Sequence, residues 1–206
     1  MPRKLLFAAN WKMHMGTKET NEYLNEFVIH TQTINGDVVF FVPYTVLSKA
    51  KELIQGFDIG LGAQNSHHED KGAFTGEISP GMLKEFCNYV LIGHSERRYV
   101  FNETDAHVNK KLKKAFQYNL LPVVCIGETE EEKNENKTSD VLAKQLQKAF
   151  EGISAEDAAH VVIAYEPVWA IGTGKIPTPL EIEDIHSFIR ETIEVMFGND
   201  TAQKMR

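Results

Sequence analysis

The sequence predicts an α/β fold in which parallel strands alternate with helices, and two observations indicate it. First, six short apolar runs lack the alternation of a half-buried strand, as is typical of strands covered on both faces. They span residues 5–9, 38–42, 59–63, 89–92, 121–125 and 161–165. Second, segments with apolar residues at helical spacing follow these runs. A βα unit repeated six times requires a parallel sheet covered by helices.

The helical period is clearest in four segments. Apolar residues recur at helical spacing within residues 23–28, 108–116, 141–149 and 182–193. The acidic run Glu130–Glu132 is suited to a helix N-terminus, where carboxylates complement the dipole. Pro177 and Pro179 mark the start of the last helix, and Gly198 marks its end.

Polar residues that follow the strands favour a barrel over a doubly wound sheet, which periodicity alone leaves open. They are Asn10, Lys12, Gln64, Asn65, His94 and Glu166. All lie at the carboxyl ends of strands, the face on which barrel enzymes assemble their sites. A dinucleotide-binding sheet would place a glycine-rich turn after its first strand, but residues 10–16 read NWKMHMG. No linker divides the chain, so the sequence predicts one domain over residues 1–206.

The composition indicates a globular, cytoplasmic protein. With 206 residues, 42% of them hydrophobic, the chain is long enough to bury a large core. Its net charge of -7 argues against a nucleic-acid or acidic-membrane partner. The N-terminal residues 1–9 predict neither signal peptide nor anchor. Cys87 and Cys125 lie in or beside apolar runs, where buried, reduced thiols are expected.

Three motifs resemble those of the triosephosphate isomerase family. They read Ala8-Ala9-Asn10-Trp11-Lys12-Met13, Leu91-Ile92-Gly93-His94-Ser95-Glu96-Arg97-Arg98, and Ala164-Tyr165-Glu166-Pro167-Val168-Trp169-Ala170-Ile171-Gly172-Thr173-Gly174-Lys175. Their order and spacing match the family from the first strand to the last helix. The resemblance implies a TIM-type (β/α) barrel and an isomerase without cofactor or metal. Its reaction would interconvert dihydroxyacetone phosphate and D-glyceraldehyde 3-phosphate through an enediolate, in glycolysis and gluconeogenesis.

The resemblance implies three catalytic residues. Glu166 would be the base that moves the proton between adjacent carbons, which requires a positioned and partly desolvated carboxylate. His94 would polarise the carbonyl as a neutral ring, because Ser95 is suited to cap a following helix whose dipole disfavours imidazolium. Lys12 would attract the phosphate and stabilise charge on the enediolate oxygens.

Further residues would bind substrate or support the site. By resemblance, Asn10 holds Lys12 in place and donates to substrate, and Glu96 pairs with Lys12. The segment Pro167–Lys175 resembles a lid that closes over the phosphate and keeps water from the enediolate. Gly172 would donate its amide to the phosphate, and Gly172 and Gly174 would provide backbone freedom.

A long loop over residues 67–79 predicts an assembly element. Loops of this length without regular structure are usually functional. The loop resembles the one that family members insert into a neighbouring subunit, with Thr75 reaching the site. The resemblance therefore implies a homodimer, and the apolar tip around Phe74 is better buried than exposed.

Several other readings are weaker. Gly174-Lys175 lacks the following Ser/Thr and the first glycine of a P-loop. His67–Asp70 are adjacent side chains that point apart, which argues against a metal site. The lysines at 110, 111, 113 and 114 are expected on the solvated side of an amphipathic helix, and Cys125 is expected to pack beside Glu166. A phosphosugar enzyme of another class would need a Schiff-base lysine or a metal site, whereas Lys12 belongs to the isomerase motif.

The resemblance covers six of the family's eight βα units, and the sequence ends at Arg206, where the seventh strand would begin. The glycine-rich turns after strands seven and eight, which supply phosphate-binding amides in such barrels, would follow that point. The alternative to an active isomerase is therefore a noncatalytic barrel fragment that needs its C-terminal units or a partner chain.

Overall fold

The computed structural model describes residues 3–206, except for the side chains of residues 31–33. The chain forms two compact units. The first runs to Ile92 and includes Lys114–Pro122, and the second comprises Gly93–Lys113 and Val123–Arg206. Residues 1–9 were predicted to contain no signal peptide, and residues 1–2 of that segment lie outside the described residues. Across the described part, no helix combines the length and apolar character needed to cross a membrane.

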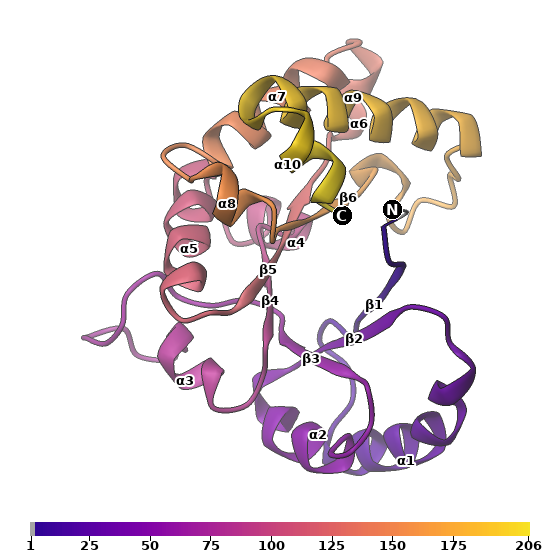
Figure 1. Ribbon diagram of the computed structural model, residues 1–206, viewed down its shortest axis with the longest axis vertical. Coiled ribbons are helices and arrows are strands. Elements are labelled where there is room, and N and C mark those ends of the chain that lie inside the picture. Colours follow the sequence, from indigo (N-terminus) through magenta and orange to yellow (C-terminus); the bar gives the residue numbers. More distant parts are fainter. Residues whose placement is uncertain (1–2) are drawn as a thin grey trace. The chain divides into compact units, whose positions relative to one another are not determined.

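The strands confirm all six predicted runs, with boundaries that differ by at most one residue. They are β1 (Leu6–Asn10), β2 (Asp37–Val42), β3 (Gly60–Ala63), β4 (Tyr89–Ile92), β5 (Leu121–Ile126) and β6 (Val162–Tyr165). Within the first unit the order is β1-β2-β3-β4, with parallel pairing (Figure 1). Within the second, β6 pairs parallel with β5. The predicted parallel α/β class is confirmed.

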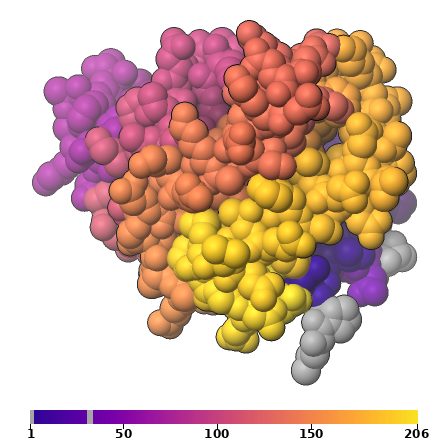
Figure 2. Space-filling view, turned by 90° about the horizontal axis from the view of Figure 1, so that it is seen from above, coloured from indigo at the N-terminus to yellow at the C-terminus, as the bar shows by residue number. Residues whose placement is uncertain are grey.

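Helices follow the strands as the periodicity predicts. They are α1 (Thr17–Phe27), α2 (Leu47–Leu53), α3 (Pro80–Lys84), α4 (Ser95–Tyr99), α5 (Asp105–Gln117), α6 (Glu130–Asn134), α7 (Thr138–Ala149), α8 (Ala155–Ala158), α9 (Pro179–Phe197) and α10 (Asn199–Lys204), with 3₁₀ turns η1 (Val28–Thr33), η2 (Tyr44–Val46) and η3 (Val168–Ala170). The acidic run opens α6, and Gly198 ends α9 at φ 85°. Figure 2 shows α10, in yellow, beside α9, which also packs on α7.

Two glycines in β3 make room for large rings in the core of the first unit. A Cβ on Gly62 would lie 2.4 Å from the Phe41 ring, and one on Gly60 would lie 2.8 Å from the Tyr89 ring. Both distances are too short for carbon atoms in contact. Because Gly60 and Gly62 have no side chains, the ring of Phe41 from β2 can pack against β3, where it is 1% exposed.

The prediction that every strand is buried on both faces is wrong for β1. Phe7, in the middle of β1, is 50% exposed, and residues 162–165 of β6 are only half-buried. Within the first unit β1 lies at an edge of the sheet, with β2 as its one neighbouring strand. Strand β2, which has a neighbour on each side in the same unit, is buried over five consecutive residues.

The prediction that Lys111 faces solvent is also wrong. Lys111 is 4% exposed and pairs closely with Glu103, which also accepts a 2.7 Å hydrogen bond from Nε of Arg97. Burial alone would raise the pKa of the Glu103 carboxyl, but the hydrogen bonds and charges of Lys111 and Arg97 outweigh it and hold that pKa below its usual value. A lysine with a buried carboxylate partner can thus occupy a position that the spacing of α5 assigned to the solvated face.

Both cysteines are buried and form no disulfide, in agreement with the expected reduced thiols. Burial raises the pKa of Cys87 to about 11. Burial and then the neighbouring charge of Glu166 raise the pKa of Cys125 well above its usual value, so this thiol stays protonated beside the carboxylate. The packing role expected for Cys125 agrees with this environment.

Candidate active site

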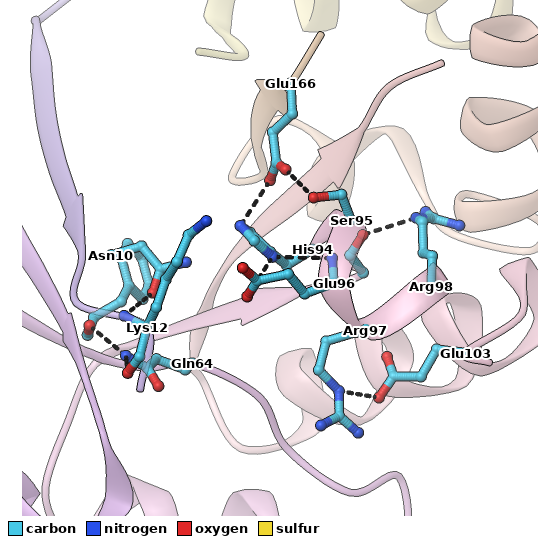
Figure 3. A network of polar contacts seen from close by, with 12 residues as sticks. Asn10, Lys12, Gln64, His94, Ser95, Glu96, Arg97, Arg98, Glu103 and Glu166 are labelled. Atoms are coloured by element: carbon cyan, nitrogen blue, oxygen red, sulfur yellow. Dashed lines mark hydrogen bonds and ion pairs between the residues drawn. The ribbon is translucent and has the colours of Figure 1, made fainter. Parts of the chain in front are cut away.

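In the first unit, the loop after β1 holds Lys12 by its backbone (Figure 3). Asn10 accepts a 2.9 Å hydrogen bond from the Lys12 amide through its Oδ1, and Gln64 donates to the Lys12 carbonyl at 2.9 Å. Gln64 also donates to the carbonyl of Phe41 at 3.0 Å. Lys12 adopts φ 53°, a left-handed conformation that is uncommon for residues other than glycine. The two amide side chains satisfy the backbone groups that this conformation leaves out of the ladder.

An aromatic cluster of Trp11, Tyr23 and Phe40 anchors the loop that carries Lys12. The Trp11 amide donates to the carbonyl of Phe41 at 3.0 Å, and the Trp11 ring is 5.7 Å from both Tyr23 and Phe40. The pair with Tyr23 is edge-to-face and the pair with Phe40 is tilted, and such aromatic pairs add to the burial energy of the rings. The turn that carries Lys12 is therefore anchored both to β2 and to α1.

In the second unit, Glu166 lies between His94 and Ser95 (Figure 3). The Ser95 hydroxyl donates to Oε2 of Glu166 at 2.7 Å, and Nε2 of His94 lies 3.4 Å from Oε1. All three side chains are largely shielded from solvent, with His94 8% and Ser95 6% exposed. Both carboxylate oxygens of Glu166 thus face polar groups of the segment that opens α4.

Contacts at both ring nitrogens orient His94. The Glu96 amide donates to Nδ1 at 3.3 Å, and Nε2 faces Glu166. The neutral ring stays a prediction. The predicted cap is wrong, however, because His94 itself caps α4 and Ser95 is the first residue of that helix. Ser95 uses its hydroxyl on Glu166 instead.

Glu96 lies in the first turn of α4, and its carboxylate is 3.6 Å from Nδ1 of His94. Lys12 belongs to the first unit and Glu96 to the second. Their pairing, implied by the resemblance, stays a prediction.

Arg98, which the sequence shows only as part of a motif, organises the backbone around His94. Its Nε donates to the carbonyl of Gly93 at 2.7 Å, and its guanidinium also reaches Asp105 at 2.6 Å and the carbonyl of Cys125 at 3.2 Å. The side chain is 8% exposed. Because Cys125 lies in β5, this one side chain ties the segment that carries His94 to the strand beside Glu166.

Glu166 is held by a backbone contact that the sequence did not reveal. Its amide donates to the carbonyl of Ile126 at 2.8 Å, and a Cβ on Gly127 would lie 1.9 Å from its carbonyl oxygen. The buried amide of Gln145 accepts from the Gly127 N–H at 2.9 Å and donates to the Gly127 carbonyl at 3.0 Å. Gly127 is required for close approach of two backbones, and Gln145 fixes it in that position.

We expect Gly127→Ala to lower the free energy of unfolding by about 2–3 kcal/mol and to reduce turnover, because the methyl group displaces the backbone of Glu166. Urea unfolding measures the first effect. Gly16→Ala is the control: its Cβ would meet only the flexible Glu19 side chain, at 3.7 Å, so we expect a loss below about 1 kcal/mol, from the poorer cap of α1 alone. Equal stability of the two variants would contradict the close approach.

The predicted lid, Pro167–Lys175, begins directly after Glu166 and contains η3. Gly172 and Gly174 adopt φ 71° and 78°, and a Cβ at either position would meet open space. Trp169 is 8% exposed and donates from Nε1 to Oε1 of Glu128 at 2.8 Å. Glu128, buried to 1% exposure, also accepts from the Tyr165 hydroxyl at 3.1 Å. Both glycines adopt left-handed backbone conformations that suit glycine, and Glu128 is a contact of this segment that the sequence missed. Closure of the segment as a lid stays a prediction.

The loop over residues 67–79 belongs to the first unit and is closed at its base by a 2.8 Å bond from the His67 amide to the carbonyl of Ile78. Asp70 pairs with Lys114 at 3.1 Å and accepts from the Tyr118 hydroxyl at 2.9 Å. Thr75 is exposed at the tip, and Phe74 is 44% exposed. Within residues 3–206, no cluster of three or more histidine, cysteine, aspartate or glutamate side chains is arranged to hold a metal.

The arrangement in the second unit is suited to proton transfer. A carboxylate that can accept a proton lies 3.4 Å from an imidazole that can donate one, in a site mostly closed to solvent. The first unit supplies a fixed turn bearing an ammonium group, which suits an anionic ligand.

Comparisons with known proteins agree with this chemistry. A family model described as triosephosphate isomerase matches residues 5–206. The triosephosphate isomerases of Alkaliphilus oremlandii and Caldanaerobacter subterraneus are 48% and 46% identical over 205 residues, covering 99% of this chain and 83% of each relative. A crystal structure of triosephosphate isomerase from Bartonella henselae matches with a TM-score of 0.87 at 39% identity, covering 99% of this chain and 81% of that one. The similarity spans every predicted site residue.

Proposed function

This chain belongs to the triosephosphate isomerase family, and from that premise we propose that it interconverts dihydroxyacetone phosphate and D-glyceraldehyde 3-phosphate in glycolysis and gluconeogenesis. The observation that carries the proposal is the pair formed by the Glu166 carboxylate and the His94 ring, 3.4 Å apart. Moving a proton between adjacent carbons needs a base for the carbon and a donor for the oxygens.

Glu166 takes the proton from the carbon beside the carbonyl and returns it to the neighbouring carbon. To do so it leaves the Ser95 hydroxyl, which stabilises the carboxylate in its resting position at 2.7 Å. His94 donates from Nε2 to the carbonyl oxygen and moves the proton between the two oxygens of the enediolate. No cofactor or metal is needed, because the substrate's own carbonyl makes the neighbouring carbon acidic.

Lys12 binds the phosphate and balances charge on the enediolate, and Asn10 keeps its turn in place and donates to substrate. Glu96 pairs with Lys12. The lid closes over the phosphate, to which the Gly172 amide donates, and excludes water from the enediolate. Because Pro167 follows Glu166 directly, movement of the lid and reorientation of the carboxylate are coupled through one peptide bond.

We further propose that residues 1–206 form one domain of a TIM-type (β/α) barrel and contribute six of its eight βα units. The chain spans 83% of the length of the Alkaliphilus relative, and its strands run parallel in chain order within each unit. Family membership and the Glu166–His94 pair favour a catalytic isomerase over a noncatalytic barrel fragment.

The proposed assembly is a homodimer formed through the loop over residues 67–79, in the cytoplasm. Support comes from the exposed Phe74 at the tip and the anchored base of this loop, and from the buried thiols of Cys87 and Cys125. Sedimentation velocity at micromolar concentration tests the assembly, and a monomer across the whole range would contradict it.

The test of the function is turnover of D-glyceraldehyde 3-phosphate, followed by coupling the dihydroxyacetone phosphate formed to an NADH-dependent reductase. We expect saturable turnover that inorganic phosphate inhibits competitively, because the phosphate group supplies much of the binding. His94→Gln is expected to lower kcat by about a hundred-fold or more, because the amide cannot shuttle the proton. Turnover that is unaffected by this change would contradict the proposed mechanism.

A further inference from the structure

Trp169, near the start of the lid, is held by a cation that none of the proposed catalytic roles uses. The ammonium group of Lys133, in α6, lies 3.3 Å from the centre of the Trp169 ring. The indole Nε1 donates at 2.8 Å to Glu128. The indole is thus fixed at its edge by a buried carboxylate and on its face by an ammonium group. A cation over a tryptophan ring is the strongest pairing of this class, particularly where the ring is desolvated.

Lys133 is itself fixed in place. Its ammonium group pairs with Oε1 of Glu181 at 3.1 Å, and Glu181 belongs to the capping box of α9 through Thr178. The amide and hydroxyl of Thr178 together with Lys133 lower the pKa of Glu181 to about 2, so this anchor is charged at neutral pH. The lysine therefore joins the first turn of α9 to the lid.

A second ion pair acts at the far end of the lid. Lys175 contacts Glu130, the first residue of α6, so that one short helix binds the lid near both its ends. A cavity of about 190 Å³ adjoins the held ring and is lined by Tyr165, Trp169, Pro177, Ile182 and Ile185, among others. The indole thus has space into which it can move once its contacts are broken, while the contacts themselves favour the position described here.

We propose that Lys133 is a positioning residue that clamps Trp169 and thereby stabilises the ligand-free position of the lid. The clamp belongs to the ligand-free state, since in this arrangement both oxygens of Glu166 are engaged by Ser95 and His94. An interaction present in one state only shifts the equilibrium between the two. Lys133 therefore opposes lid closure and weakens the affinity for the phosphate group. This inference rests on the proposed function for its kinetic consequence, but the clamp itself does not.

Hydrogen–deuterium exchange of the lid tests the clamp without any assay of turnover. In the ligand-free protein, we expect Lys133→Met to accelerate exchange in peptides covering residues 168–175 about three-fold or more, because the cation–π contact is lost while the stem packing is retained. Lys133→Arg keeps a cation over the ring and should restore slow exchange. Lys148→Met is the control, since Lys148 pairs with Glu151 on the surface of α7 and should leave the lid unchanged.

Kinetics then test the direction of the effect. The inhibition constant of inorganic phosphate should fall about three-fold or more in Lys133→Met, because closure no longer has to break the clamp. Glu181→Gln keeps the capping box but loses the charge that pairs with Lys133. It should accelerate exchange in the lid and lower the inhibition constant of inorganic phosphate, each by less than Lys133→Met does. If Lys133→Met does not fold, Glu181→Gln tests the proposal in its place. Unchanged lid exchange in the folded variant, or weaker phosphate inhibition, would overturn the proposal. Absence of turnover in the unmodified chain would refute the proposed function, while the exchange data would still decide the clamp.

Discussion

Glu166→Gln should lower kcat about a thousand-fold while the inhibition constant of inorganic phosphate changes by less than about three-fold. The amide is nearly the same size as the carboxylate, but it cannot accept the carbon-bound proton. It can still accept the hydrogen bond that the Ser95 hydroxyl now donates at 2.7 Å, so the resting geometry should persist. The phosphate group is bound elsewhere, by Lys12 and the lid in our proposal, and should not sense the change. Steady-state kinetics with competitive inhibition measures both quantities.

The matched control is Glu156→Gln, an exposed residue of α8 in the same unit. It makes the same chemical change outside the site and should leave kcat within about two-fold, as expected for a surface substitution. A Glu166→Gln variant with undiminished kcat would remove Glu166 from the mechanism. A variant with equally reduced phosphate affinity would indicate that the change disturbs the lid, since the lid begins at the next residue.

The elements that the sequence predicted best are those fixed by local pattern. Buried strands are recognised in the sequence as apolar runs, and the predicted ends of all six strands lie within one residue of the observed ends. The exposure of Phe7 was not predictable in the same way, because the β1 run is as apolar as the others and its position at the edge of its unit is a property of the topology. The burial of Lys111 was not predictable either, because it depends on an ion pair with the buried carboxylate of Glu103, eight residues earlier in the chain.

The candidate site likewise contains residues that a local motif predicts and residues that only the tertiary structure reveals. Glu166, His94 and Lys12 stand in long motifs, whereas the groups that position them are single residues at distant places in the sequence. Gln64 holds Lys12 across 52 positions, and Gln145 fixes the backbone beside Glu166 from the middle of an amphipathic helix. A buried glutamine on an apolar helix face was a signal of such a role, because a buried amide must find partners. No comparable signal marked Lys133, whose cation–π contact exists only once the lid is folded against α6.

Lys12→Met should raise the KM for D-glyceraldehyde 3-phosphate about 10- to 100-fold, since a hydrogen bond to a charged group contributes about 1.5–3 kcal/mol. The protein carries a net charge of -7, so a dianionic substrate depends on local cations for its binding. Methionine keeps an unbranched side chain of similar length, and the backbone at φ 53° is held by Asn10 and Gln64 whatever the side chain is. The loss should therefore report the ammonium group and not a collapsed turn.

Lys18→Met removes the same charge from the same unit and is the control. Lys18 is 88% exposed, with Glu22 3.8 Å away on α1, and its loss should change KM by less than about two-fold. Increasing ionic strength should raise KM for the unmodified chain more than for Lys12→Met, because screening acts on an attraction that the variant has already lost. If the two lysine variants share one KM and one salt dependence, the phosphate is bound by other groups, and Lys12 has no part in substrate recognition.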